Sequence, residues 1–143
     1  MENKIIIAKN EKEISMAKEI RRQVFQVEQG IDPKLDFDGK DEDADLIIAF
    51  YENKAVGTIR VRYLSEKIAK LERLAALKDY RKMGIGKSIV DFVISYLQKK
   101  GVEVITLDAQ EHAKKFYEKF GFEQKGEVFE EVKIPHIQMW KKI

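Results

Sequence analysis

The feature that most constrains the fold of this chain is a glycine turn between a strand-like segment and an amphipathic helix. Residues 68–77 read IAKLERLAAL, and residues 81–86 read RKMGIG. Over residues 85–97 apolar side chains recur every three to four positions, which is typical of a helix that buries one face. The first amides of such a helix lack partners within the helix, and its dipole places partial positive charge there. Because glycines let a ligand approach the backbone closely, this turn predicts a phosphate-binding site.

The residues around the turn supply charge and hydrogen-bond donors for a phosphate. Arg81, Lys82 and Lys87 bring positive charge, and Ser88 adds a hydroxyl in the first turn of the helix. We expect the phosphate oxygens to meet the backbone amides of Met83, Gly84, Ile85, Gly86 and Lys87. The alternative interpretation is an ordinary turn with solvated basic residues, and Lys82 is the best candidate for a bystander.

Two nucleotide-binding motifs partly resemble this turn. Gly86-Lys87-Ser88 resembles the end of a P-loop, but the first glycine of that motif would fall at position 81, which is arginine. The dinucleotide fingerprint would need glycine or alanine at position 89, which is isoleucine. Neither motif is complete. A nucleotide-hydrolysing P-loop protein remains an alternative, and it predicts magnesium-dependent binding of ATP.

Periodicity along the chain predicts one α/β domain over residues 1–143, with the element order β-α-β-β-β-α-β-α-β-β. Strands are expected at 4–8, 44–50, 55–63, 68–77, 102–107, 122–129 and 135–140, and helices at 14–27, 85–97 and 111–120. A hairpin turn is expected at 52–54. The segment 32–45 contains seven acidic residues and two lysines, and we interpret it as a solvated loop with a helical turn.

Composition excludes several classes of protein. The chain has no cysteine and two histidines, so disulfides, thiolate nucleophiles and thiolate metal sites are excluded, and we expect no metal. The formal net charge is +2, without the basic stripe and interleaved aromatics of a nucleic-acid binder. Apolar runs are too short for a membrane span or a signal peptide. We therefore expect a cytoplasmic protein with neither nucleic acid nor membrane as a partner.

Two segments resemble the Gcn5-related N-acetyltransferase (GNAT) family: LAALKDYRKMGIGKSIV at 74–90 and FYEKFGF at 116–122. The family's pattern Arg/Gln-x-x-Gly-x-Gly/Ala is matched by Arg81, Gly84 and Gly86. Four shorter segments are similar to the bacterial ElaA-like branch, namely VFQVEQGI at 24–31, KLER at 70–73, DAQ at 108–110 and IPHIQM at 134–139. The resemblance implies a mixed, largely antiparallel sheet in which a central parallel strand pair splays apart, flanked by helices.

The resemblance also implies a reaction. A primary amine, carried by a small molecule or a protein, would attack acetyl-CoA or a related short acyl-CoA directly in a ternary complex. The diphosphate of the coenzyme would occupy the glycine turn, and its pantetheine would lie in the splay. The residues implied to hold the pantetheine are Leu74, Ala75, Ala76, Gln110 and Phe116. Many relatives carry asparagine at position 110, so Gln110 departs from the family pattern.

Two residues are candidates for proton transfer by the same resemblance. Tyr117 would protonate the departing thiolate, although a tyrosine packed in the core is the alternative. Glu72 would be the general base, and the alternative is a simple ion pair with Arg60 or Arg62 on the adjoining strand. Strand periodicity further predicts that Arg73 lies on the face opposite Glu72.

The acceptor site is expected to involve Phe25, Glu28, Gln29 and His136. Homodimers are frequent in the family, and the resemblance allows one here. A different class of function stays open at this point: a regulatory module that binds acyl-CoA and catalyses no reaction.

Overall fold

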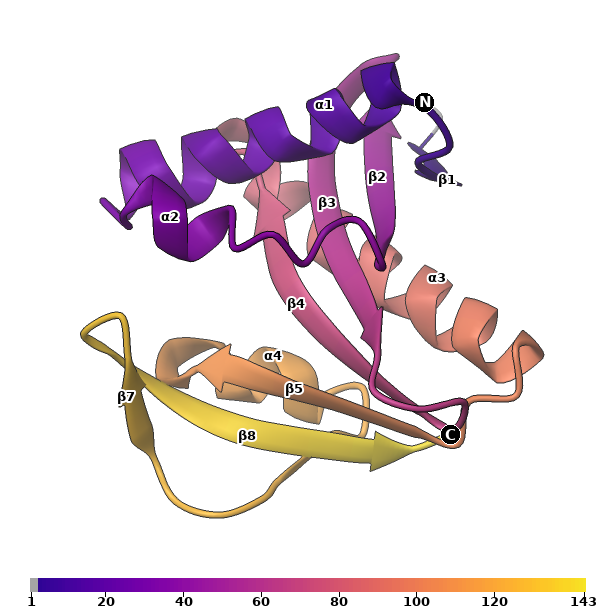
Figure 1. Ribbon diagram of the computed structural model, residues 1–143, viewed down its shortest axis with the longest axis vertical. Coiled ribbons are helices and arrows are strands. Elements are labelled where there is room, and N and C mark those ends of the chain that lie inside the picture. The colour runs from indigo at the N-terminus through magenta and orange to yellow at the C-terminus, as the bar shows by residue number, and fades with distance from the viewer. Residues whose placement is uncertain (1–2) are drawn as a thin grey trace.

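An eight-stranded sheet forms the centre of the computed structural model, which describes residues 3–143 (Figure 1). The strands run in the order β1-β2-β3-β4-β5-β8-β6, with β7 paired to β8. Their bounds are β1 Asn3–Ile7, β2 Asp45–Tyr51, β3 Lys54–Tyr63, β4 Ile68–Ala76, β5 Val104–Gln110, β6 Glu123–Gln124, β7 Phe129–Glu131 and β8 Ile134–Lys142. Within residues 3–143 only β4 and β5 pair in parallel, and the remaining pairs are antiparallel. The predicted mixed, largely antiparallel sheet is confirmed.

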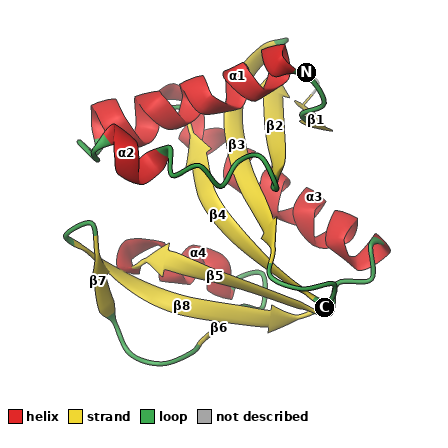
Figure 2. Ribbon diagram, viewed as in Figure 1, coloured by secondary structure: helices red, strands yellow, loops and turns green. Residues whose placement is uncertain are grey.

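Helices cover both faces of this sheet (Figure 2). They are α1 Glu11–Arg21, its π-helical continuation η1 Arg22–Glu28, α2 Pro33–Asp36, the 3₁₀ turn η2 Lys78–Met83, α3 Ile85–Lys99, the 3₁₀ turn η3 Glu111–Ala113 and α4 Lys114–Glu118. Asn10 caps α1 by accepting a hydrogen bond from the backbone N–H of Glu13. Among residues 3–143, no helix is both long and apolar enough to cross a bilayer.

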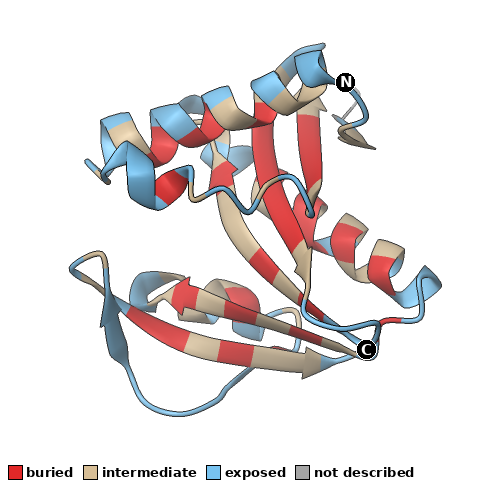
Figure 3. Ribbon diagram, viewed as in Figure 1, coloured by how far each residue is buried: buried red, intermediate tan, exposed pale blue. Residues whose placement is uncertain are grey.

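The alternation of side chains along the strands creates two cores. Ile47 of β2 packs in the larger core with Ile89 of α3, whereas the next residue, Ile48, packs in the smaller core with Ile20 of α1. Opposite faces for consecutive residues are what a strand requires. Buried residues accordingly lie along the central strands and along the inward faces of α1 and α3 (Figure 3).

The parallel strands β4 and β5 separate about halfway along their length. Pairing is limited to residues 68–71 of β4 and 104–107 of β5. Beyond Leu71, β4 stays paired with β3 only, through a bulge at which Arg73 adopts a φ of 59°. The two strands therefore diverge toward the α1 end of the molecule (Figure 1), as the resemblance implied.

Two expectations about the C-terminal part need correction. The single strand expected at 122–129 consists of two short strands, because Gly126, with a φ of 86°, interrupts the pairing with β8. The helix expected at 111–120 is a 3₁₀ turn followed by the five-residue α4. The hairpin turn at 52–54 is confirmed, with Glu52 and Asn53 both at positive φ.

Candidate active site

A pocket of about 540 Å³ occupies the gap where β4 and β5 diverge. It brings together residues that are distant in the sequence, from η1, α2, β4, β5, α4 and the β7–β8 turn. Eleven of the predicted site residues line it: Phe25, Gln29, Glu72, Leu74, Ala75, Ala76, Arg81, Gln110, Phe116, Tyr117 and His136. Glu28, which was predicted for the acceptor site, does not line the pocket. Of the predicted phosphate site, Arg81 lines it and the other residues do not.

The glycine turn lies beside the pocket, at the start of α3. Gly84 caps this helix with a left-handed conformation (φ 77°), which an amino acid with a side chain adopts at a cost. A Cβ added to Gly86 would lie 3.4 Å from Cζ of Phe116, so the turn packs against the aromatic wall of the pocket. Outside the pocket are Lys82, Met83, Gly84, Ile85, Gly86, Lys87 and Ser88. Lys87 pairs with Asp91 at 2.8 Å, and Lys82 is exposed.

Arg81 is held by Glu28 at the end of η1. Its two terminal nitrogens lie 2.5 Å from the two carboxylate oxygens of Glu28, and its Nε donates to the carbonyl oxygen of Ala76 at 2.9 Å. The hydrogen bonds from Arg81 lower the pKa of Glu28. Two residues predicted for different sites, the phosphate site and the acceptor site, are thus direct partners.

A second link crosses the open end of the splay. Nε2 of Gln110, the last residue of β5, donates to Oε1 of Gln29 at 3.0 Å. Oε1 of Gln110 lies 2.7 Å from Nε2 of His112. Gln110 therefore connects the end of η1 to the second of the parted strands.

Tyr117 lies beneath the pocket with only 7% of its surface exposed. Its ring makes edge contacts with Phe116 and Phe122, at centroid distances of 5.0 and 5.8 Å. Burial raises the pKa of its hydroxyl, so the group keeps its proton at neutral pH. No hydrogen bond of this hydroxyl to another described residue occurs.

Glu72 is surrounded by positive charge. Arg60 donates to its Oε1 at 2.8 and 3.1 Å, Nη1 of Arg62 lies 3.4 Å from both carboxylate oxygens, and Nζ of Lys70 lies 3.6 Å from Oε2. Burial by itself would raise the pKa of Glu72, but the charge and hydrogen bonds of Arg60, with Lys70 and Arg62, outweigh it and lower that pKa. Both ion pairs that the alternative interpretation named are present.

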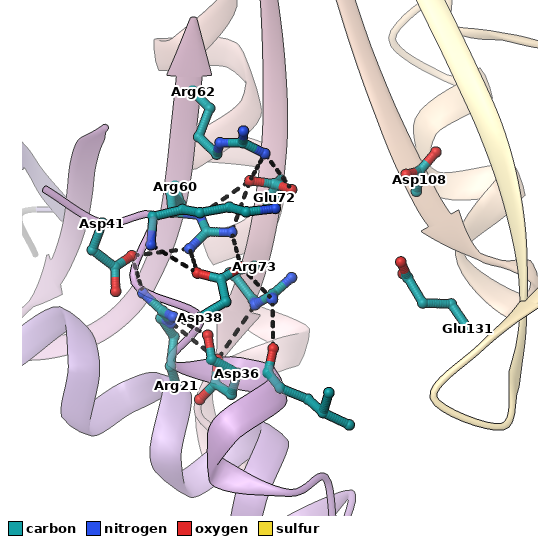
Figure 4. Close-up of polar contacts among 12 residues, drawn as sticks. Arg21, Asp36, Asp38, Asp41, Arg60, Arg62, Glu72, Arg73, Asp108 and Glu131 are labelled. Atoms are coloured by element: carbon teal, nitrogen blue, oxygen red, sulfur yellow. Dashed lines mark hydrogen bonds and ion pairs between the residues drawn. The ribbon is translucent and has the colours of Figure 1, made fainter. Parts of the chain in front are cut away.

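The structure corrects two expectations about this wall of the pocket. Arg73 does not point away from Glu72, because the bulge breaks the alternation: Arg73 pairs with Asp38, which also accepts from Arg60, the partner of Glu72 (Figure 4). The acidic segment 32–45 is not simply solvated. Asp36 is 1% exposed and accepts from Arg21 at 3.2 Å, and Asp38 accepts from the fully buried Arg60 at 2.7 and 3.0 Å.

The ion pairs along this wall of the pocket form a network that we call the arginine cluster. It consists of Arg21, Arg60, Arg73, Asp36, Asp38 and Asp41. Its arginines come from α1, β3 and β4, so no local pattern in the acidic segment reveals its partners. Three further pocket residues were missed: Asp108, Glu131 and His112. For Asp108 a signal existed, because it shares a strand face with Gln110, two positions away.

Among the described residues, no group of three histidine, aspartate or glutamate side chains is arranged to hold a metal ion. The site is thus an elongated gap between two strands, with a helix N-terminus beside one end and a set of paired charges along one wall. Such a site can take an extended ligand that carries a phosphate at one end.

Comparison with known proteins agrees with this description. A model of the "Acetyltransferase (GNAT) domain" matches residues 6–143. The chain is 40% identical over 135 residues to a Bacillus subtilis (strain 168) protein provisionally named an acetyltransferase, covering 92% of this chain and 91% of that one. The fold defines an acyltransferase-like α/β protein with a parted strand pair, and the chain belongs to the GNAT family of acetyltransferases.

Solved structures share the fold. The crystal structure of Escherichia coli ElaA superposes with a TM-score of 0.85 at 24% identity, covering 98% of each chain. A GNAT family acetyltransferase from Elizabethkingia anophelis, with acetyl-CoA bound, gives a TM-score of 0.78 at 16% identity, covering 99% of this chain and 98% of that one. The predicted family is therefore confirmed, and the assignment of individual site residues stays a prediction.

Proposed function

We propose that this protein transfers an acetyl or similarly short acyl group from acyl-CoA to a primary amine by direct attack within a ternary complex. The observation that carries the proposal is the 540 Å³ pocket between the parted strands, which lies next to the glycine turn at the start of α3. The acetyl-CoA bound to the related-fold protein of Elizabethkingia anophelis supports the choice of ligand. The acceptor is a small molecule or a protein that carries a primary amine.

The free edge of β4 supports binding of the pantetheine. Beyond Leu71 this strand pairs with β3 on one side only, so the backbone groups that face β5 lack strand partners. Backbone donors and acceptors in a pocket need partners, and an extended ligand with amide groups can supply them. In this proposal the pantetheine pairs with Leu74 and Ala76, next to Ala75, Gln110 and Phe116. One backbone N–H here would polarise the thioester carbonyl, an effect worth about 3 kcal/mol.

The coenzyme diphosphate would then lie on the amides of residues 83–87. Arg81 and Lys87 would supply charge to it, with Ser88 as a further donor and Lys82 near the rim. The positive end of a 15-residue helix favours an anion at this place.

Tyr117 is the group that we assign to the thiolate. Its hydroxyl is protonated, lies at the pocket and has no partner among the described residues. A phenol can pass a proton to a thiolate once the two are positioned, although thiols are the stronger acids in water. Proximity of the amine and the thioester contributes most of the rate, about 7–11 kcal/mol for a well-oriented pair.

The test is to incubate the protein with acetyl-CoA and a panel of primary amines, with released thiol as the readout. The panel contains an alkyl diamine, an aromatic ethylamine, an amino-acid amide and an amino sugar. We expect at least one amine to give turnover, and Tyr117→Phe to reduce kcat by about 10²-fold, the typical contribution of acid catalysis, while acetyl-CoA binding by calorimetry is retained. Binding of ATP without binding of acetyl-CoA would contradict the proposal.

Binding of acetyl-CoA without thiol release from any amine would instead favour the regulatory module that catalyses no reaction. The variant Tyr117→Phe then has no turnover to lose.

A further inference from the structure

One face of the sheet carries polar side chains at the pocket. In the register of β5 and β8, Asp108 pairs with Gln138 and Gln110 pairs with His136. Paired residues share a face, and so do residues two positions apart in a strand, so these four side chains lie on one face. The opposite face holds the apolar neighbours Ala109 and Ile137, which pack in the core with Tyr117. His136 therefore reaches the pocket from the face opposite Tyr117.

The two ring nitrogens of His136 have different environments. Nδ1 lies 2.7 Å from the carbonyl oxygen of Ile134. Because a carbonyl oxygen only accepts hydrogen bonds, Nδ1 must carry the proton of the neutral ring, and Nε2 carries the lone pair. Nε2 lies 3.6 Å from Oε2 of Glu131, too far for a hydrogen bond. The ring also stacks on Phe129 at 5.9 Å and is 5% exposed, so its orientation is fixed.

Glu72, the base that the family resemblance implies, is placed differently. Its carboxylate accepts from Arg60 and Arg62 and lies 3.6 Å from Lys70. These cations lower its pKa, and a carboxylate held in this way is a weaker proton acceptor. Each carboxylate oxygen of Glu72 accepts a hydrogen bond from an arginine, whereas Nε2 of His136 has no hydrogen-bond donor among the described residues.

We propose that Nε2 of His136 is the general base for the acceptor amine, and that Glu131 is the positioning carboxylate that stabilises the imidazolium formed. The proposal rests on the proposed acyl transfer. The acceptor ammonium gives one proton to Nε2, and its freed lone pair forms a bond to the thioester carbon. The carbon–sulfur bond then breaks, and the thiolate takes a proton from Tyr117. The second amine proton restores the tyrosine, and the imidazolium releases its proton to water.

Other titratable groups face this histidine across the pocket. Glu131 approaches from β7, Asp108 from β5, His112 from η3 and Tyr117 from α4. From β4, Lys70 and Glu72 line the same pocket, and Lys70 pairs with Asp108 at 3.1 Å. Glu131, half exposed at 52%, is the carboxylate nearest to the ring, with Oε2 3.6 Å from Nε2.

The variant His136→Asn tests the proposal, because the asparagine amide can replace Nδ1 as donor to Ile134 but supplies no base. The measurement is kcat/KM against pH, with acetyl-CoA and the best amine of the panel. The kcat/KM of the wild type should rise with pH and then level off, because a general base acts once it has lost its proton. The kcat/KM of the variant should have no level region, because without a base the reaction depends on the fraction of acceptor amine that is already uncharged. Below the pKa of the amine, this fraction grows about tenfold per pH unit.

At neutral pH the variant should be slower by about 10²-fold, the typical contribution of a general base, and the difference should shrink toward the pH at which the amine itself deprotonates. Calorimetry should show unchanged binding of acetyl-CoA. If His136→Asn keeps the level region, the role of His136 is contradicted but the proposed function is not. If the wild type does not bind acetyl-CoA, the proposed function itself is contradicted.

The other histidine provides a matched control. His112→Asn should keep the level region whatever it does to the rate, because Nε2 of His112 donates to the amide oxygen of Gln110 at 2.7 Å and so offers no lone pair there. In the same variant, the single remaining imidazole can be followed by NMR, which tests the proposal even if His136→Asn fails to fold. Its titration midpoint should coincide with the point at which kcat/KM levels off. A mismatch, or a level region that disappears in Glu72→Gln but not in His136→Asn, would overturn the assignment.

Glu131→Gln separates the stabilising carboxylate from the base. The glutamine keeps the shape of the side chain but removes the charge that we propose stabilises the imidazolium formed, so the height of the level region of kcat/KM should fall while acetyl-CoA binding is retained. A purely structural role of Glu131 would change stability without lowering the level region.

Discussion

The wall of the pocket that carries Asp38 and Glu72 is built from charged side chains around a buried arginine, whereas the glycine turn beside the pocket, which we call the open wall, has exposed residues. On the first wall, Arg60 is fully buried and bonds to three carboxylates from two segments. On the second wall, Met83 is 42% exposed and a Cβ at Gly84 would meet nothing within 4 Å. We infer that the first wall holds its shape without a ligand, and that the second is left open for one.

The largest effect on stability is expected at Arg60 of the first wall. Substitution by methionine keeps most of the volume but leaves Asp38, Asp41 and Glu72 without their shared partner. Removing one side of a buried ion pair typically costs about 3–5 kcal/mol, so the free energy of unfolding in urea should fall by that order. The control is Arg22→Met, which breaks an exposed pair with Glu19 and should leave the urea midpoint nearly unchanged. Equal losses in both variants would contradict a special role of the arginine cluster.

Low pH should reduce the stability that the ion pairs of the same wall contribute. Hydrogen bonds from Arg60 hold the pKa of Asp38 well below its usual range, and the pKa of Glu72 is lowered as well. Because both values are lower in the folded state, the unfolded chain binds more protons once the pH falls below about 4, the ordinary range of carboxyl groups. Stability is therefore fully present above that range and decreases as the pH falls through it.

Urea midpoints measured at several pH values check this expectation. The decrease below about pH 4 should be shallower in Asp38→Asn, since one of the responsible carboxyl groups is gone. Asp43→Asn changes an exposed carboxylate of the same segment and should keep the slope of the wild type. Identical slopes in all three proteins would show that the acid sensitivity arises elsewhere.

The two walls also differ in what the sequence could predict. The glycine turn was predictable because its signal is local: two glycines, flanking charge and an amphipathic helix within about 20 residues. The arginine cluster was not, because its ion pairs join arginines of three elements to carboxylates 15 to 37 positions away in the sequence. The bulge at Arg73 was missed for a related reason, since alternation in β4 is broken by its pairing with β3 rather than by a glycine or proline. Single residues, including Tyr117, were placed by family resemblance rather than by pattern.

The next effect concerns the open wall. In Lys87→Ala the ion pair with Asp91 is lost, but both partners are exposed, so the fold should be retained. The substitution removes a cation from the place where we propose that the coenzyme diphosphate lies. Because a hydrogen bond to a charged group contributes about 1.5–3 kcal/mol, the Kd for coenzyme A by calorimetry should rise by about tenfold or more.

Gly101→Ala gives the opposite pattern and serves as its control. Gly101 has a φ of 85° and follows the far end of α3, so an alanine there should cost about 1–2 kcal/mol of stability without changing the Kd. If both variants bind coenzyme A as the wild type does, the glycine turn is not its phosphate site.

The smallest effect is expected at Glu28, which joins the end of η1 to the glycine turn through Arg81. The pair is about 40% exposed on each side, so Glu28→Gln should change the free energy of unfolding by less than about 1 kcal/mol. Its effect on the coenzyme has a definite sign, however. If Arg81 serves the diphosphate, the carboxylate competes with the ligand for the same guanidinium, and the variant should bind coenzyme A a few-fold more tightly. Pantetheine, which lacks the diphosphate, should bind both proteins equally. Weaker binding of coenzyme A by Glu28→Gln would mean that Glu28 orients Arg81 for the ligand, and that the wall we describe as open is already shaped before the ligand arrives.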